Sequence, residues 1–145
     1  GTEPVALIAG MARAFEMFTA EQAGRMAHVT QLRARLQAGL RERCAPVIVN
    51  GSQSHRLPNT LNIAFPGLEG DPLLIALDLE GVACSLGSTC ASGSSEPAPV
   101  LVAMNCAPEI LNCSVRFSVS ILNTVAEIDE AVRRIADVVN RLRNC

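Results

Sequence analysis

Apolar residues recur every three or four positions along the first part of the chain, which is the spacing of one helix face. Residues 4–18 form the first such stretch. Thr19 follows, with Gln22 three residues later, and this pair matches a capping box that opens a new helix. The pattern therefore predicts two consecutive helices, over residues 4–18 and from Thr19 to about Arg43. Their apolar positions are Ile8, Met11, Phe15, Phe18, Val29, Leu32, Leu36 and Leu40.

Four short segments further along have the patterns of strands. Residues 60–65 and 114–120 alternate apolar and polar side chains, as a strand with one buried face does. Residues 46–50 and 82–85 are shorter apolar runs that predict two further strands. In the last strand, the polar face carries Arg116, Ser118 and Ser120.

Three more helices are indicated where capping residues precede apolar positions. They are expected over residues 72–79, over residues 96–104, and from Thr124 to the end of the chain. The signals are Asp71 followed by Pro72, then Ser95, and finally Thr124 with Glu127 as a second capping box; Gly81 ends the first of these helices.

The order of these elements predicts the fold class. Two helices, strands alternating with helices, and a closing helix indicate an α/β (α+β) fold, in which a small sheet packs with helices. We expect residues 1–145 to form a single domain, with leading helices in 1–44 and a small α/β domain in 45–145.

Composition narrows the class of protein. The 145 residues carry a net charge of −2, so no basic surface indicates nucleic-acid binding or an anionic membrane. No apolar run approaches the roughly 18 residues of a transmembrane helix. The six cysteines contain no CxxC pair and only two histidines are present, which argues against a metal site. We therefore expect a cytoplasmic protein with reduced thiols.

Cys90 stands apart from the other cysteines, because the rest of residues 87–97 are small or polar. A position just before a predicted helix favours the thiolate, and a loop of small residues exposes it. Two interpretations stay open from composition alone: an incidental surface thiol, or a mobile and activated nucleophile. Cys84 lies among apolar neighbours and is expected in the core.

Arg116 lies on the polar face of a strand whose other face is apolar. An arginine there can bind a carboxylate through a bidentate fork, or it can form a salt bridge with a nearby acidic side chain. His55 lies in a polar loop, where it could titrate near neutral pH or simply be solvated. We assign His28 no role.

Four segments, taken in order, resemble the C-terminal part of the NifS/IscS cysteine desulfurases, which are fold-type I pyridoxal-phosphate enzymes of the class-V aminotransferase group. They are "LPNTLNIAF", "GVACSLGSTCASGSSEPAPVL", "SVRFSVS" and "TVAEIDEAV". The resemblance implies an enzyme that takes sulfur from L-cysteine, leaves alanine and holds the sulfur as a persulfide. It also implies a homodimer and a sulfur-acceptor or scaffold protein as partner, in iron–sulfur cluster assembly or another sulfur-transfer pathway.

The same resemblance assigns roles to individual residues. Cys90, in a catalytic loop over residues 86–95, stands where the family forms its persulfide. Arg116 stands where the family binds the substrate carboxylate. Thr2 stands where a threonine reaches the cofactor phosphate of the partner subunit. Three further residues match family positions to which we assign no role: His55, Asn59 and Ser88.

The chain also departs from the family pattern. Ser120 and the following "ILNT" replace a glycine and a more polar segment. There is no lysine at all, whereas the family binds its cofactor through a lysine, with a stacked histidine and an aspartate, in a preceding large domain. We therefore expect the chain to be the C-terminal part of a longer enzyme, inactive alone and without covalent pyridoxal phosphate.

Two alternatives remain open from the sequence. A selenocysteine lyase uses the same fold and similar chemistry. A stand-alone carrier or scaffold domain would accept a persulfide on Cys90 without any cofactor. An open reading frame that continues upstream of Gly1 into a lysine-bearing domain would favour an enzyme over the carrier.

Overall fold

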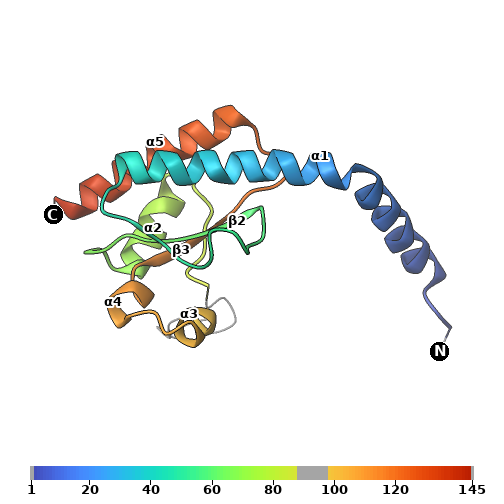
Figure 1. Ribbon diagram of the computed structural model, residues 1–145, viewed down its shortest axis with the longest axis horizontal. Coiled ribbons are helices and arrows are strands. Elements are labelled where there is room, and N and C mark those ends of the chain that lie inside the picture. Colours follow the sequence, from blue (N-terminus) through green and yellow to red (C-terminus); the bar gives the residue numbers. More distant parts are fainter. Residues whose placement is uncertain (1, 88–97, 145) are drawn as a thin grey trace.

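The computed structural model describes residues 2–87 and 98–144 and shows a small sheet covered by helices (Figure 1). The elements, in order, are α1 (Val5–Arg43), β1 (Ile48–Val49), β2 (Thr60–Ala64), α2 (Gly70–Leu79), α3 (Pro99–Ala103), α4 (Pro108–Leu111), β3 (Ser114–Ser118) and α5 (Val125–Arg143). This combination of helices with one small sheet confirms the predicted fold class.

The sheet has the strand order β1–β2–β3, and both strand pairs are antiparallel. Leu61 lies opposite Phe117 and Ile63 opposite Val115, and these four side chains share one buried face, as their alternation predicts. The strand predicted over residues 82–85 is wrong except for one bridge, between Ser85 and Arg116. Gly81 and Val82 still belong to the turn that ends α2, since the Val82 N–H bonds to the Leu77 carbonyl.

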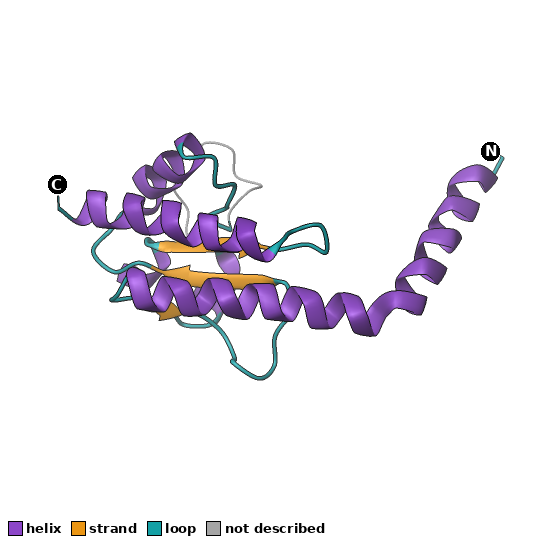
Figure 2. Ribbon diagram, turned by 90° about the horizontal axis from the view of Figure 1, so that it is seen from above, coloured by secondary structure: helices purple, strands orange, loops and turns teal. Residues whose placement is uncertain are grey.

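Helices α1 and α5 lie side by side over one face of the sheet (Figure 2). The predicted capping box of α5 is present, with the Thr124 hydroxyl accepting from the Glu127 N–H and the Glu127 carboxylate accepting from the Thr124 N–H. The buried stripe of α5 packs on the sheet and consists of Ile128, Val132, Ile135, Ala136, Val138 and Val139. On the other face of β3, Ser114 is buried and bonds to α4, whereas Arg116 and Ser118 are exposed.

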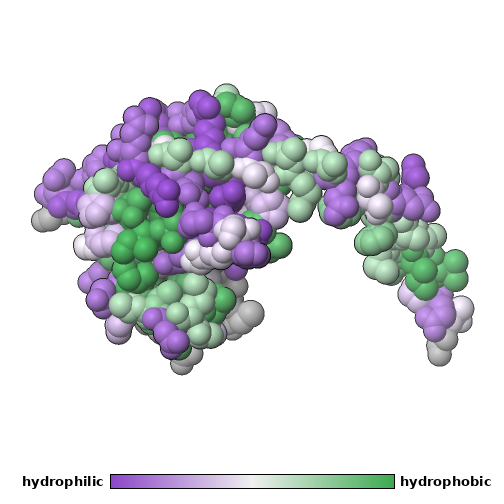
Figure 3. Space-filling model, viewed as in Figure 1, coloured by the Kyte–Doolittle hydropathy of each residue, from purple (hydrophilic) through white to green (hydrophobic). Residues whose placement is uncertain are grey.

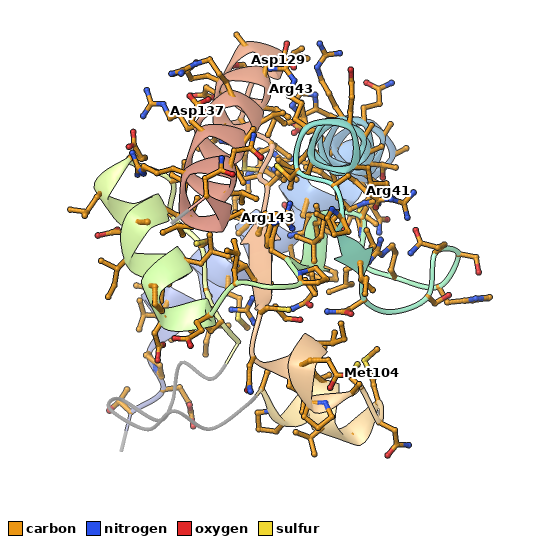
Figure 4. All side chains as sticks on the ribbon, turned by 90° about the vertical axis from the view of Figure 1, so that its left-hand side faces the viewer. Arg41, Arg43, Met104, Asp129, Asp137 and Arg143 are labelled. Atoms are coloured by element: carbon orange, nitrogen blue, oxygen red, sulfur yellow. The ribbon has the colours of Figure 1, made fainter. Side chains whose placement is uncertain are left out.

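Two arrangements of polar groups tie α1 to the rest of the fold. His28 Nε2 lies 3.0 Å from the Asn123 carbonyl oxygen, just before α5 begins. At the other end, Arg143 (labelled in Figure 4) donates to the carbonyl oxygens of Cys44 and Pro46 at 2.6 and 2.7 Å. The guanidinium thereby satisfies carbonyls where α1 ends and the chain turns towards β1.

The two helices predicted before Arg43 are one continuous helix, α1. The Thr19 hydroxyl does not cap a new helix; it donates to the Phe15 carbonyl at 2.8 Å, and hydroxyl bonds of this kind bend helices. Figure 1 shows that the N-terminal part of α1 bends away from the sheet, so its apolar side chains leave the core. Phe15 is 70% exposed, and Figure 3 shows hydrophobic surface at this end of the molecule.

The start of α2 also differs from the prediction, because the helix begins at Gly70 and not at Pro72. Gly70 is buried and its N–H donates to the Asn112 carbonyl at 2.8 Å. This bond fixes the chain at Gly70, where the helix begins, two residues before the predicted start. A Cβ at Gly70 would lie 2.9 Å from that carbonyl oxygen, so only glycine fits this approach. Asp71 therefore lies in the first turn and does not cap.

Helix α3 is shorter than the predicted helix over residues 96–104. It begins at Pro99 and comprises five residues, with Ala98 at the N-cap and no side-chain cap. Ser95, the predicted cap, lies outside the described residues. Because α3 has little more than one turn, its dipole adds little to the case for an activated thiol at Cys90.

The close approach of α1 to α5 provides a test of this packing. A Cβ at Gly39 would lie 2.8 Å from both methyl groups of Val132, a branched side chain held in the core. We expect Gly39→Ala to lower the free energy of unfolding by about 1–3 kcal/mol through overpacking. The matched control is Gly24→Ala in the same helix, where nothing lies within 4 Å and the better helix former should add about 0.5–1 kcal/mol.

The measurement is chemical denaturation of the two variants and of the unchanged chain, in which the loss of helix content reports unfolding. Equal shifts of the two midpoints would contradict the packing of α1 on α5 at this position.

Candidate functional site

The polar face of the sheet centres on Arg116 in the middle of β3. Val115 and Phe117 on either side of it are buried, which directs the Arg116 side chain to the opposite face, where it is exposed. On β2, Asn62 lies directly opposite Arg116. The predicted alternation of this strand is therefore confirmed, and Arg116 lies on the exposed part of the polar face.

The charge of Arg116 is not neutralised by the described part of the chain. Seven arginine–carboxylate pairs are present in residues 2–87 and 98–144, such as Arg25 with Glu21 at 2.6 Å, and none of them involves Arg116. The salt-bridge interpretation of this residue thus has no partner among the described side chains. A free guanidinium on a rigid strand is suited to bind a carboxylate from outside.

The main chain of Arg116 is fixed on both sides. β2 flanks one edge of β3, while on the other edge the Arg116 N–H donates to the Ser85 carbonyl at 2.7 Å and the Ser85 N–H donates back at 3.1 Å. The Ser85 hydroxyl also accepts from the Gly87 N–H at 3.0 Å, forming a tight turn. The segment that leads to Cys90 is therefore anchored beside Arg116.

The two ends of the segment 88–97 start close together. Gly87 has a φ of 89°, which favours glycine, and a Cβ on it would lie 3.0 Å from the Cβ of Ala98. Ala98 is itself buried. The segment that contains Cys90 thus leaves and re-enters the fold at one point, next to the strand of Arg116. Cys90 and Ser88 themselves lie outside the described residues.

The remaining predicted positions are spread over the molecule. Thr2 is exposed and precedes α1, whose first turns lie far from the sheet in Figure 1, so the structure does not bring it near Arg116. His55 is exposed and its Nδ1 lies 2.9 Å from the Ser54 hydroxyl. Asn59 accepts at its carbonyl from the Val119 N–H and so holds the end of the sheet.

The described cysteines show which thiols are inert. Burial raises the pKa of Cys44 to about 11 and that of Cys84 to about 11, which keeps both protonated at neutral pH. Cys84 packs against the core, as predicted. Cys113, which borders the connection from α4 to β3, is also buried and its pKa is raised by burial. Cys106 is half-buried.

Sequence reasoning missed a buried polar group on the same face as Arg116. Asn50 and Ser114 are the two buried polar residues in the described chain, and both hydrogen-bond near Asn62. The available signal was the alternation of Leu61, Asn62 and Ile63, which places Asn62 on the polar face. The described residues contain no cluster that could hold a metal ion, and no helix among them is both long and apolar enough to cross a membrane.

The chain is similar to known cysteine desulfurases along its length. It is 37% identical over 143 residues to "Cysteine desulfurase IscS" of Dictyoglomus turgidum, covering 99% of this chain and 36% of that protein. It is 40% identical over 144 residues to "Cysteine desulfurase NifS" of Azotobacter vinelandii, with the same coverage. The chain thus spans about a third of the length of the curated relatives it matches.

Solved structures agree with this similarity. A structure titled "NIFS-LIKE PROTEIN" superposes with a TM-score of 0.83 at 29% identity, covering 98% of this chain and 35% of that chain. A NifS-like protein from Rickettsia africae gives a TM-score of 0.81 at 28% identity, over 97% of this chain and 36% of that one. The resemblance stated from the sequence is confirmed in both sequence and fold.

A model of a protein family matches as well. The family described as "Aminotransferase class-V" covers residues 1–131, which includes α1, the whole sheet and the start of α5. The chain belongs to the aminotransferase class-V family.

Proposed function

We propose that the whole protein carrying this chain is a cysteine desulfurase, in which Cys90 accepts sulfur from L-cysteine and Arg116 binds the carboxylate of that substrate. One observation carries the proposal. The anchor of the segment that contains Cys90 is hydrogen-bonded to the main chain of Arg116, whose exposed side chain has no carboxylate partner among the described residues.

The proposed reaction needs no external oxidant. The Cys90 Sγ forms a bond to the substrate sulfur while the Cβ–S bond of the substrate breaks. The electron pair of that bond and a proton go to Cβ, which becomes the methyl group of alanine. Cysteine and the Cys90 thiol are thereby converted to alanine and a Cys90 persulfide, in which sulfur is oxidised as carbon is reduced.

Arg116 supplies orientation in this proposal. Its guanidinium offers two parallel N–H groups to a carboxylate, which fixes the direction in which the substrate side chain extends. Its backbone is hydrogen-bonded on both edges of β3, so the fork has a rigid base.

The length of chain between the two residues is compatible with this chemistry. Cys90 is the fifth residue after Ser85, so its backbone can lie at most about 17 Å from that anchor. A carboxylate held by Arg116 lies within that radius, and so does solvent beyond the sheet. The same tether could thus present a persulfide to an acceptor protein.

The cofactor requires residues that this chain does not contain. With no lysine in its 145 residues, the chain offers no side-chain amine for the covalent linkage to pyridoxal phosphate. In a homodimer, Thr2 is proposed to approach the cofactor phosphate of the partner subunit, because the start of α1 extends away from the sheet of its own chain.

The other parts of the proposal concern organisation and pathway. We propose residues 1–145 as the C-terminal domain, with residues 86–95 as its catalytic loop. The persulfide is proposed to pass to an acceptor or scaffold protein, in iron–sulfur cluster assembly or another sulfur-transfer pathway.

The experiment is an assay of the full-length protein, loaded with pyridoxal phosphate, with L-cysteine and separately with L-selenocysteine. We expect L-cysteine to give alanine and, after reduction, sulfide in equal amounts. Mass spectrometry should find a persulfide on the peptide that contains Cys90. Turnover of L-selenocysteine alone would instead identify a selenocysteine lyase. Turnover of neither amino acid would overturn the proposed activity.

A further inference from the structure

A chain of hydrogen bonds runs across the polar face of the sheet, at its buried end, and ends at Asn62. The Ser114 hydroxyl donates to the Ile110 carbonyl at 2.6 Å. Asn50 Nδ2 lies 2.9 Å from the Ser114 hydroxyl and 2.7 Å from Asn62 Oδ1. Ser114 is 1% exposed and Asn50 8% exposed, so these bonds are shielded from water.

We call the hydrogen-bonded series Ser114–Asn50–Asn62 the relay. The bond from Ser114 to Ile110 determines the direction of every other bond in it. A carbonyl oxygen can only accept, so the single hydroxyl proton of Ser114 is directed to Ile110. The Ser114 oxygen must then accept from Asn50, which places the NH₂ group of Asn50 on this side. That NH₂ group also faces Asn62, so Asn62 presents its oxygen to Asn50 and its own NH₂ group away from the relay.

The NH₂ group of Asn62 has no partner among the described residues. Only Arg56 Nε is a fully buried side-chain nitrogen without a hydrogen bond in that part of the chain, so Asn62 Nδ2, in a half-buried residue, is not fully buried. Its two donor hydrogens thus have no acceptor in the described part of the chain.

Asn62 and Arg116 form a non-hydrogen-bonded antiparallel pair, which is the kind of pair in which the two Cα atoms lie closer together. The Asn62 carbonyl accepts from the Asn50 N–H at 3.0 Å, and the Arg116 backbone bonds to Ser85, so the two residues do not bond to each other. In pairs of this kind the side chains are close neighbours. An amide NH₂ and a guanidinium cannot bond one another, because both only donate here, and a shared acceptor is what satisfies both.

We propose that Asn62 Nδ2 donates to the same carboxylate that Arg116 binds, and that Asn50 and Ser114 are positioning residues that aim it. This inference rests on the proposed function, because that function supplies the carboxylate. An amino-acid carboxylate has two oxygens, and it accepts from the fork of Arg116 and from Asn62 together. The buried relay holds the amide in one orientation, so the donor is in place before the substrate arrives.

The test uses the full-length protein loaded with pyridoxal phosphate, with Asn62→Asp as the main variant. Aspartate has the shape of asparagine and keeps an oxygen for Asn50, but it presents a negative oxygen where the NH₂ group stood. We expect KM for L-cysteine to rise about tenfold or more, because a hydrogen bond to a charged group is lost, while kcat changes much less. Ser118→Asp is the matched control, since it adds the same charge one cross-strand pair along on the same face, and it should change KM less than threefold.

A binding experiment separates this inference from the proposed function. Calorimetry with 3-mercaptopropionate measures carboxylate binding without turnover, and 3-mercaptopropanol is the uncharged counterpart. Asn62→Asp should weaken the binding of 3-mercaptopropionate about tenfold and leave the binding of 3-mercaptopropanol unchanged. If the aspartate variant does not fold, Asn62→Ala is used in its place. Equal effects on both compounds, no effect on either, or an equal effect of Ser118→Asp would overturn the role of Asn62. A wild-type protein that binds 3-mercaptopropionate through Asn62 but releases no sulfur from cysteine would overturn only the proposed function.

Discussion

Replacing Cys90 by serine in the full-length protein is expected to abolish sulfur release from L-cysteine, with turnover reduced at least about 10³-fold. A serine hydroxyl cannot form the sulfur–sulfur bond on which the proposed reaction depends. Binding of L-cysteine should persist, because Arg116 and the polar face are unchanged. The measurement is sulfide and alanine production at saturating L-cysteine, together with a binding constant for the substrate.

The matched control for this prediction is Cys106→Ser. Cys106 is a half-buried thiol that follows α3 in the chain, whereas Cys90 precedes it, and the loss of Cys106 should leave turnover unchanged. Alkylation with limiting reagent should also modify Cys90 before Cys44 and Cys84, whose pKa values are both about 11. Full activity of Cys90→Ser would show that another thiol accepts the sulfur.

The second large effect is expected at Arg116. Arg116→Ala removes a two-bond fork, and each hydrogen bond to a charged group is worth about 1.5–3 kcal/mol, so kcat/KM for L-cysteine should fall about 10²- to 10⁴-fold. Arg116→Lys keeps the charge but not the fork, and should recover only a part of this loss. The measurement is kcat/KM for both variants, with the melting temperature as a check of folding.

Arg133→Ala is the control for a lost arginine. Arg133 is exposed on α5 and pairs with Glu130 and Asp137 on the same helix, contacts that contribute little to stability. This variant should retain kcat/KM. If Arg116→Ala were equally active, the free guanidinium on the polar face would have no part in substrate binding.

The two predictions concern Cys90 and Arg116, which are far apart in the sequence, and the arrangement of the sheet connects them. Helices α1 and α5 cover the apolar face, so β2 and β3 can display polar side chains on the other. Backbone hydrogen bonds then bring Ser85, which leads to Cys90, to the edge of the strand that contains Arg116. The fold thus holds a candidate binding group and the base of a candidate nucleophile's tether next to each other.

The sequence by itself determined the features that depend on near neighbours along the chain. The capping box of Thr124 with Glu127 needs only residues one turn apart, and it is present as predicted. The alternation through β2 and β3 depends on the two-residue period of a strand, so the faces of Leu61, Phe117 and Arg116 were predictable. The resemblance of ordered motifs likewise indicated the family.

Tertiary structure decided the features that depend on distant partners. The Thr19 hydroxyl could cap a helix or bond the preceding turn, and the sequence alone favoured the first, whereas the continuous α1 shows the second. The start of α2 depends on the Asn112 carbonyl, which no local pattern can reveal. The orientation of Asn62 depends on a relay through Asn50 and Ser114, and a hydrogen bond between such residues is specified only when the chain brings them together.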